Sequence, residues 1–154
     1  GVPAYLLAAA LTGVVAQRLV RRLCPHCREP SEEALPAWVE GASSTGRLWR
    51  AAGCTACGGT GFSGRLALQE LLVVDTALQQ AIVHRAGLEE MRELARRQGM
   101  RTLAEDGIEK ALQGRTTLSE VVRVLYGEAD AADFPGTFSG AARGDCGGAD
   151  DGGV

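Results

Sequence analysis

The chain has 154 residues, which suits one domain or a core domain with a tail, and its 45% hydrophobic content is ordinary for a globular protein. Its formal net charge of −3 gives no sign of a nucleic-acid binder, since such domains are usually basic. Five cysteines are an odd number, which disfavours a disulfide framework and favours a reducing compartment.

The first segment, residues 1–23, predicts a single helix. Its apolar run from Ala4 to Ala16 is 13 residues long. A membrane span needs about 20 residues, and a signal peptide would carry basic residues before its apolar core. We therefore expect no membrane span. Apolar side chains recur at helical spacing, and the pattern continues into basic residues: Leu7, Leu11, Val14, Val15 and Leu19, then Arg18, Arg21 and Arg22.

Two cysteine pairs follow, Cys24-Pro-His-Cys27 and Cys54-Thr-Ala-Cys57, with 26 residues between them. Each pair places two thiolates on one tight turn, and two pairs complete the tetrahedron that Zn²⁺ prefers. The spacing exceeds the common one of about 15–20 residues, but closure entropy grows only with the logarithm of loop length. We predict a structural zinc site formed by Cys24, Cys27, Cys54 and Cys57. Four thiolates leave no open position for a catalytic water or a substrate.

Residues 24–74 are expected to form this metal-binding module. The loop between the pairs is polar and broken, and Trp38 and Trp49 are expected to cover the loop or the cysteines. Glycines 53, 58 and 59 flank the second pair, where the turn needs backbone freedom. The stretch 62–74 predicts a short hairpin that leaves the second pair.

From Asp75 the period becomes helical. Asp75 is a suitable N-cap for a helix over 76–84, and Gly87 precedes a second helix over 88–98. Capping boxes beginning at Thr102 and Thr117 open two further helices, over 103–113 and 118–126. Helices of about ten residues are unstable alone, so we expect residues 75–127 to form a compact helical bundle.

The remaining residues, 128–154, are rich in Gly, Ala and Asp and predict a disordered tail that contains the unpaired Cys146. Taken together, these elements predict a mostly α fold with a small β zinc-binding module.

An ordered series of motifs over about residues 1–126 resembles the C-terminal part of the type II secretion and type IV pilus assembly ATPases, the general secretion pathway protein E family. The series begins with the helix expected to end in Ala16-Gln17-Arg18-Leu19-Val20-Arg21-Arg22-Leu23-Cys24. It continues with Gly53-Cys54-x-x-Cys57-x-x-Thr60-Gly61-Phe62-x-Gly64-Arg65 and Glu70-Leu71-Leu72. It closes with Ala95-x-x-Gln98-Gly99-Met100-x-Thr102-Leu103-x-x-Asp106-Gly107.

The resemblance implies a fragment of a hexameric motor with a RecA-like α/β core, in which residues 1–23 are the terminal helix of that core. Such a motor binds ATP and Mg²⁺, contacts its other protomers and inner-membrane platform proteins, and drives assembly of pilin-like subunits. It works in the cytoplasm, peripheral to the inner membrane. The secretion and pilus branches are not distinguished by these motifs.

This chain contains no Gly-x-x-x-x-Gly-Lys-Ser/Thr phosphate loop, so we assign no catalytic or cofactor-binding residue and expect no ATPase activity from it alone. An alternative function is a zinc-ribbon protein-binding module, since Cys54-Thr-Ala-Cys57-Gly-Gly-Thr-Gly61 also matches the repeat of DnaJ-type chaperones. A redox Cys-x-x-Cys enzyme lacks the expected βαβ surroundings, and nucleic-acid binding lacks the charge.

Overall fold

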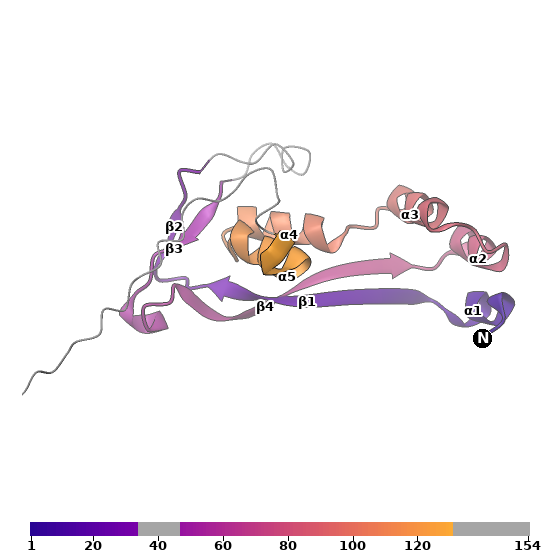
Figure 1. Ribbon diagram of the computed structural model, residues 1–154, viewed down its shortest axis with the longest axis horizontal. Helices are drawn as coiled ribbons and strands as arrows, with labels where there is room; N and C mark the ends of the chain where they lie inside the picture. The colour runs from indigo at the N-terminus through magenta and orange to yellow at the C-terminus, as the bar shows by residue number, and fades with distance from the viewer. Residues whose placement is uncertain (34–46, 131–154) are drawn as a thin grey trace, which may run out of the picture.

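Two long antiparallel strands run along the molecule in the computed structural model, which describes residues 1–33 and 47–130, the last three by their backbone only. Strand β1 (Gly13–Leu23) pairs with β4 (Phe62–Val73) from Gly13 opposite Val73 to Leu23 opposite Phe62. The register shifts once, between Arg21 and Leu23. Figure 1 shows this ribbon extending from a helical end to the end that carries the cysteine pairs.

The single helix expected over residues 1–23 is wrong. Helix α1 spans only Ala4–Ala10, and the chain then becomes extended and enters β1. The apolar residues of this segment satisfy both a helical and a strand period, and pairing with β4 decides between them. In the strand, Val20 is buried on the helix-covered face, whereas Val15 and Leu19 are exposed on the other.

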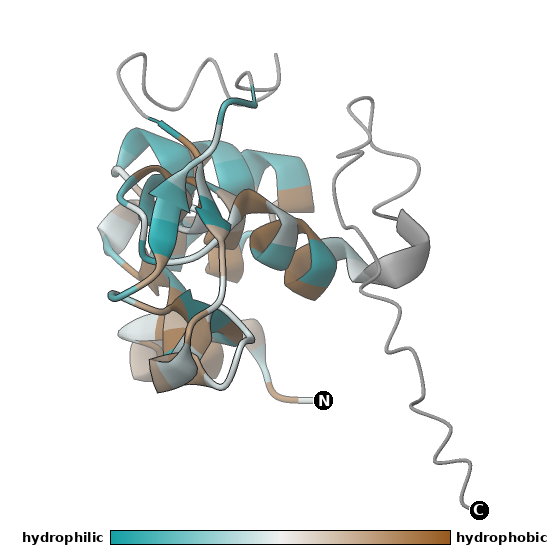
Figure 2. Ribbon diagram, turned by 90° about the vertical axis from the view of Figure 1, so that its left-hand side faces the viewer, coloured by the Kyte–Doolittle hydropathy of each residue, from teal (hydrophilic) through white to brown (hydrophobic). Residues whose placement is uncertain are grey.

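The hairpin expected over 62–74 is also absent, because β4 is one continuous strand whose partner is β1. A separate small sheet is formed by β2 (Arg28–Pro30) and β3 (Trp49–Ala51), followed by a 3₁₀ turn, η2 (Thr55–Cys57). Both short strands lie at the surface, and Figure 2, which views this end, shows them in mostly hydrophilic colours.

The four expected helices are confirmed as α2 (Thr76–Val83), α3 (Leu88–Arg97), α4 (Leu103–Leu112) and α5 (Leu118–Asp130). The Asp75 carboxylate accepts the N–H of Leu78 at 2.9 Å, so it caps α2 as expected. The capping box between Thr102 and Glu105 is complete. Gly127 breaks the regular dihedral angles of α5, with φ 79° and ψ 173°, as its place after Tyr126 predicts.

These helices do not form one bundle. Helices α4 and α5 pack on the middle of the ribbon, whereas α2 contacts α3 and α1 at its far end (Figure 1). The Asp106 carboxylate of α4 accepts the N–H of Gln69 at 2.8 Å, and Lys110 donates to the carbonyl of Ala67 at 2.9 Å, which attaches α4 to β4. A bundle is not needed because the ribbon supplies the apolar face against which α4 and α5 pack.

The core lies between the ribbon and these two helices. Its fully buried members are Val20, Leu48, Leu68, Ile108, Ala111, Leu118 and Val121. The described chain is therefore a mixed α/β structure with five helices and two small antiparallel sheets, and its strands are longer than the sequence indicated.

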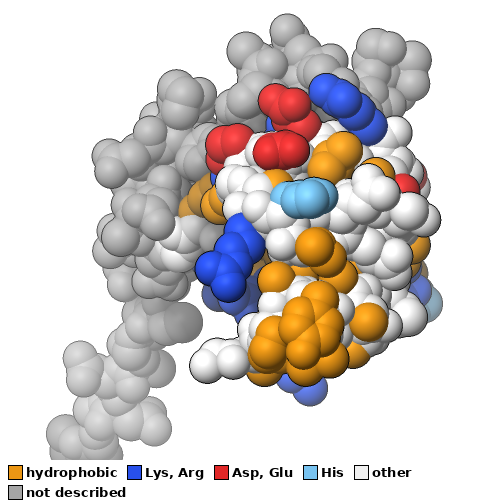
Figure 3. All heavy atoms as spheres, turned by 90° about the vertical axis from the view of Figure 1, so that its right-hand side faces the viewer, with side chains coloured by type: hydrophobic (Ala, Val, Ile, Leu, Met, Phe, Trp, Pro, Cys, Tyr) orange, Lys and Arg blue, Asp and Glu red, His pale blue; other side chains and the backbone are white. Residues whose placement is uncertain are grey.

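Several large apolar side chains remain exposed. On the end formed by α1, α2 and α3, hydrophobic side chains gather low on the face, where Figure 1 places α1 (Figure 3). The exposed large apolar side chains of α1 are Tyr5, Leu6 and Leu7. Among the described residues we find no helix with the length and hydrophobicity that crossing a bilayer requires. Residues 128–130 of the tail that was expected to be disordered belong to α5. The predictions for Trp38 and for residues 131–154, including Cys146, lie outside the described residues.

Candidate metal centre

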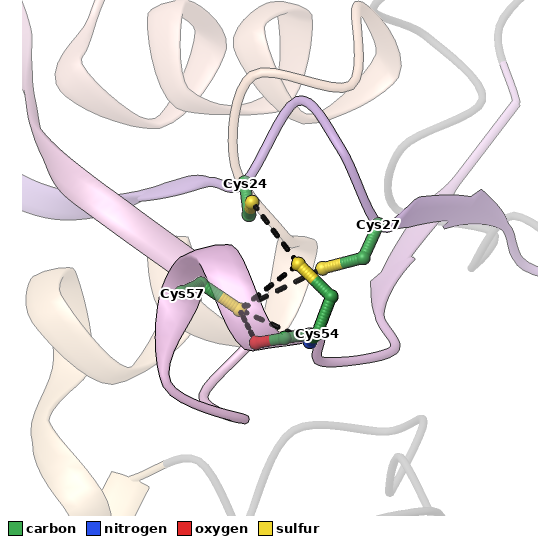
Figure 4. A group of neighbouring side chains, drawn as sticks. All are labelled: Cys24, Cys27, Cys54 and Cys57. Carbon is green, nitrogen blue, oxygen red and sulfur yellow. Dashed lines mark hydrogen bonds between the residues drawn. The ribbon is translucent and has the colours of Figure 1, made fainter.

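The four cysteines of the two pairs converge at the cysteine end of the ribbon (Figure 4). Cys24 and Cys27 lie on the turn that follows β1, and Cys54 and Cys57 lie around the 3₁₀ turn that precedes β4. Their Sγ atoms all lie within 4.8 Å of one another. Cys24 is fully buried and the other three are half-buried. The four residues chosen from sequence spacing are thus close enough to hold one metal ion.

The sulfur geometry fits a tetrahedral ion. Zn–S bonds of about 2.3 Å in a regular tetrahedron place neighbouring sulfurs about 3.8 Å apart. The observed separations are 3.7 Å between Cys54 and Cys57, 3.8 Å between Cys27 and Cys57, and 4.0 Å between Cys24 and Cys54. These distances are far longer than the roughly 2.05 Å of a disulfide bond, and the four cysteines are free. Four sulfur donors are the ligand set that Zn²⁺ favours.

Backbone N–H groups surround the second pair. The N–H groups of Cys54 and Gly61 donate to Cys57 Sγ at 3.2 and 3.1 Å. Burial acts to raise the pKa of Cys57, but these two backbone donors, together with the thiols of Cys54 and Cys27, outweigh it and lower the pKa to about 6. Burial, together with bonds to neighbouring thiols, raises the pKa of Cys27 to about 12.

Two glycines make the second turn possible. Gly53 has φ +90°, and a Cβ placed on it would lie 2.4 Å from the carbonyl oxygen of Gly59. Gly61 has φ +74°, and a Cβ there would lie 2.4 Å from the Cβ of Ala51. The sequence singled out Gly53, but the close approach of Gly61 to β3 depends on tertiary packing and was missed.

Two arginines close to the first cysteine pair in the sequence, Arg21 and Arg28, contact groups other than the sulfurs. Arg21 pairs with Glu120 at 2.8 Å, and its guanidinium carbon lies 4.1 Å from the centre of the Phe62 ring. Arg28 donates to the carbonyl of Gly114 at 2.7 Å. Trp49, expected to cover the loop or the cysteines, instead donates from Nε1 to the carbonyl of Leu112 at 3.3 Å.

Sequence reasoning also missed the role of Glu120. The capping box between Thr117 and Glu120 is only half made. The hydroxyl of Thr117 accepts the N–H of Glu120 at 3.2 Å, but the Glu120 carboxylate does not turn back to the N–H of Thr117. The Glu120 carboxylate instead accepts the backbone N–H of Arg21 at 2.9 Å and the side chains of Arg21 and Arg123. The capping-box pattern is local and could not reveal this long-range partner.

Comparisons with known proteins give one consistent result. A family model described as type II/IV secretion system protein matches residues 1–123. The type IV pilus assembly ATPase PilB of Thermus thermophilus is 50% identical over 131 residues, covering 79% of this chain and 14% of that protein.

Two further relatives come from type II secretion systems. The type II secretion system protein HxcR of Pseudomonas aeruginosa is 42% identical over 124 residues, covering 80% of this chain and 24% of that protein. The type II secretion system ATPase E of Vibrio cholerae is 42% identical over 127 residues, covering 80% of this chain and 25% of that protein. The chain thus spans a quarter or less of the length of these three relatives.

Proposed function

The chain belongs to the type II/IV secretion system protein family, and on this basis we propose that it is the zinc-binding and assembly region of a secretion or pilus motor ATPase. In this proposal it forms the C-terminal part of the motor. Residues 1–23 end the RecA-like core, residues 24–74 bind the metal, and residues 75–127 form the helical region. The motor couples ATP hydrolysis to assembly of pilin-like or pseudopilin subunits and to protein secretion.

The observation that carries the proposal is the convergence of four sulfurs from two distant turns, all within 4.8 Å of one another, in a chain of this family. Zinc bound there would crosslink the segments that lead out of β1 and into β4. All four positions are filled by protein ligands, so the metal would act as a structural crosslink. Cys24, Cys27, Cys54 and Cys57 are the proposed ligands.

The chain's own residues do not fit a nucleotide site. A phosphate loop needs a lysine that follows glycine, and the only lysine in the sequence is Lys110, which is bonded to Ala67 and Asp106. ATP and Mg²⁺ would therefore be bound by the rest of the motor. The proposed partners are the other protomers of a hexamer and platform proteins of the inner membrane, contacted from the cytoplasm.

Metal analysis tests the site directly. We expect about one zinc per purified chain, lost in Cys54→Ser with unfolding of the metal-binding turns. Cys146→Ser is the matched control, because it removes the one cysteine outside the two pairs and should keep the zinc. A metal-free chain that unfolds cooperatively and ignores strong chelators would refute the zinc site.

Two further measurements test the motor assignment. The purified chain should show no ATP hydrolysis above the level that contaminating ATPases explain. In the gene, a phosphate-loop sequence upstream of Gly1 is expected, whereas a J-type helical domain in that place would refute the motor and favour the chaperone alternative.

A further inference from the structure

The three buried polar side chains in the described part of the chain lie together, next to the first cysteine turn. They are Thr116, Thr117 and Glu120, with exposed fractions of 0%, 7% and 1%. They belong to the segment that joins α4 to α5, residues 113–117, and to the first turn of α5. We call residues 113–117 the α4–α5 turn. Burying polar groups is costly unless they are hydrogen-bonded, so their partners indicate what this segment holds.

Those partners include the last residues of β1. The hydroxyl of Thr116 donates to the carbonyl of Arg21 at 2.8 Å, and the N–H of Arg21 donates to Glu120 at 2.9 Å. The N–H of Leu23 donates to the carbonyl of Arg115 at 2.9 Å. The α4–α5 turn therefore continues the hydrogen bonding of β1 up to the residue before Cys24.

The same turn is also held from the other side of the first cysteine pair. Arg28, the residue after Cys27, donates to the carbonyl of Gly114 at 2.7 Å. Trp49 packs against Gly114 so closely that a Cβ there would lie 2.8 Å from its ring. The residues on both flanks of the Cys24–Cys27 turn, Leu23 and Arg28, are thus attached to one short segment.

From this geometry we infer that the first cysteine turn and the α4–α5 turn form one cooperative unit, in which bound metal stabilises the docking of α5 and Glu120 acts as a positioning residue for the metal ligands. The inference rests on the proposed zinc site. Metal that fixes Cys24 and Cys27 also fixes Leu23 and Arg28, and their bonds to the turn are then made without further ordering. Because such coupling is reciprocal, removing Glu120 must weaken metal binding as well.

Zinc affinity measured against a chromogenic chelator tests one direction of this coupling in the 154-residue chain. Glu120→Gln removes the charge that strengthens the bonds from Arg21 and Arg123, and it should bind zinc about tenfold more weakly. Glu93→Gln is the matched control, because Glu93 pairs with Arg97 on exposed surfaces of α3, and its affinity should not change. Equal affinities in the two variants would overturn the inference.

A second pair of variants covers the case in which Glu120→Gln fails to fold. Arg28 is exposed, so Arg28→Met removes its bond to the carbonyl of Gly114 without changing the core. The control is Arg50→Met on β3, which removes the ion pair between Arg50 and Glu29. Arg28→Met should weaken zinc binding several-fold more than Arg50→Met does. Cobalt bound in place of zinc should keep the absorption bands of four-sulfur coordination in both variants, because the ligands are unchanged. Altered bands would mean that the substitution changes the ligands themselves and would overturn the coupling.

Amide hydrogen exchange tests the other direction. On removal of zinc with a chelator, the amides of Arg21 and Leu23 should exchange at least roughly tenfold faster, since the turn no longer holds them. The amide of Val74, bonded to Thr12 at the far end of the ribbon, is the internal reference and should stay protected. Equal acceleration at Val74 would mean global unfolding and would overturn the local coupling.

The outcomes separate this inference from the proposed function. A wild-type chain that binds no zinc refutes the proposed metal site itself. A chain that binds zinc, but whose Arg21 and Leu23 amides exchange at the same rate with and without it, overturns only the coupling.

Discussion

Replacing Gly107 with alanine should destabilise the chain, although alanine is the better helix former. Gly107 lies in the middle of α4, where glycine costs about 1 kcal/mol relative to alanine. A Cβ at this position would lie 2.5 Å from Val121 Cγ1 and 3.3 Å from Leu68 Cδ1. Favourable carbon contacts begin at about 3.5 Å, so α4 or its neighbours must shift.

The size of the effect follows from how little the neighbours can move. Val121 is 2% exposed and Leu68 is fully buried, and a β-branched valine in a helix has essentially one rotamer. Overpacking of this kind costs about 1–3 kcal/mol, and the upper part of that range applies here. After subtracting the helix-propensity gain of about 1 kcal/mol, we expect Gly107→Ala to lower the free energy of unfolding by about 1–2 kcal/mol.

Urea unfolding with saturating zinc, followed by circular dichroism, measures this free energy. Ala104→Gly on the same helix is the control and should cost about 1 kcal/mol from propensity alone. In the double variant Gly107→Ala with Val121→Ala, the new methyl group fills the space of the lost ones, so the two changes should cost less together than their sum. If Gly107→Ala is as stable as the wild type, the close contact of α4 with α5 is refuted.

Two further predictions concern the second cysteine turn and Glu120. Gly61→Ala should cost about 2–3 kcal/mol in zinc-saturated unfolding, whereas Gly58→Ala, also left-handed but with open space, should cost only about 1–2 kcal/mol; equal costs would contradict the contact with β3. Burial raises the pKa of Glu120, but bonds from Arg123 and Arg21 outweigh it and lower the pKa from 4.5 to about 2. The ionised Glu120 carboxylate therefore stabilises the fold above pH 4.5, and this contribution is lost as the pH falls towards 2. We expect it to add about 2 kcal/mol to the free energy of unfolding, because solvent screens the half-exposed arginines. The stability difference between wild type and Glu120→Gln should shrink over that range, and a constant difference would refute the ion pair.

The features that the sequence predicted well are encoded over short distances. Asp75 and Thr102 cap their helices through residues three positions away, and each cysteine pair lies on a single turn. The meeting of the two pairs also followed from the sequence, because four thiolates at such spacings are typical of a shared metal ion.

The features that the sequence did not predict depend on distant partners. Residues 13–23 fit a helical period as well as a strand, and only pairing with β4, whose partner residues lie 39 to 60 positions later, makes them a strand. The four helices do not form one bundle because α4 and α5 pack on the ribbon of β1 and β4, which the sequence did not predict. Glu120 lies 99 positions from Arg21, which no local pattern can connect.

The position of the cysteine turns at the tip of the ribbon has a consequence for strand alignment. A two-stranded ribbon is marginally stable by itself and can slide. If one strand slid by one residue, its side chains would change face, which would turn Val20 of β1 or Leu68 of β4 away from α4 and α5. Sliding by two residues, which keeps the faces, would displace that strand by about 7 Å. The sulfurs of Cys24 and Cys54 are 4.0 Å apart across the tip. After such a displacement they could no longer bind the same ion. A metal bound there would select one alignment along the whole length of both strands, including their far ends beside α1.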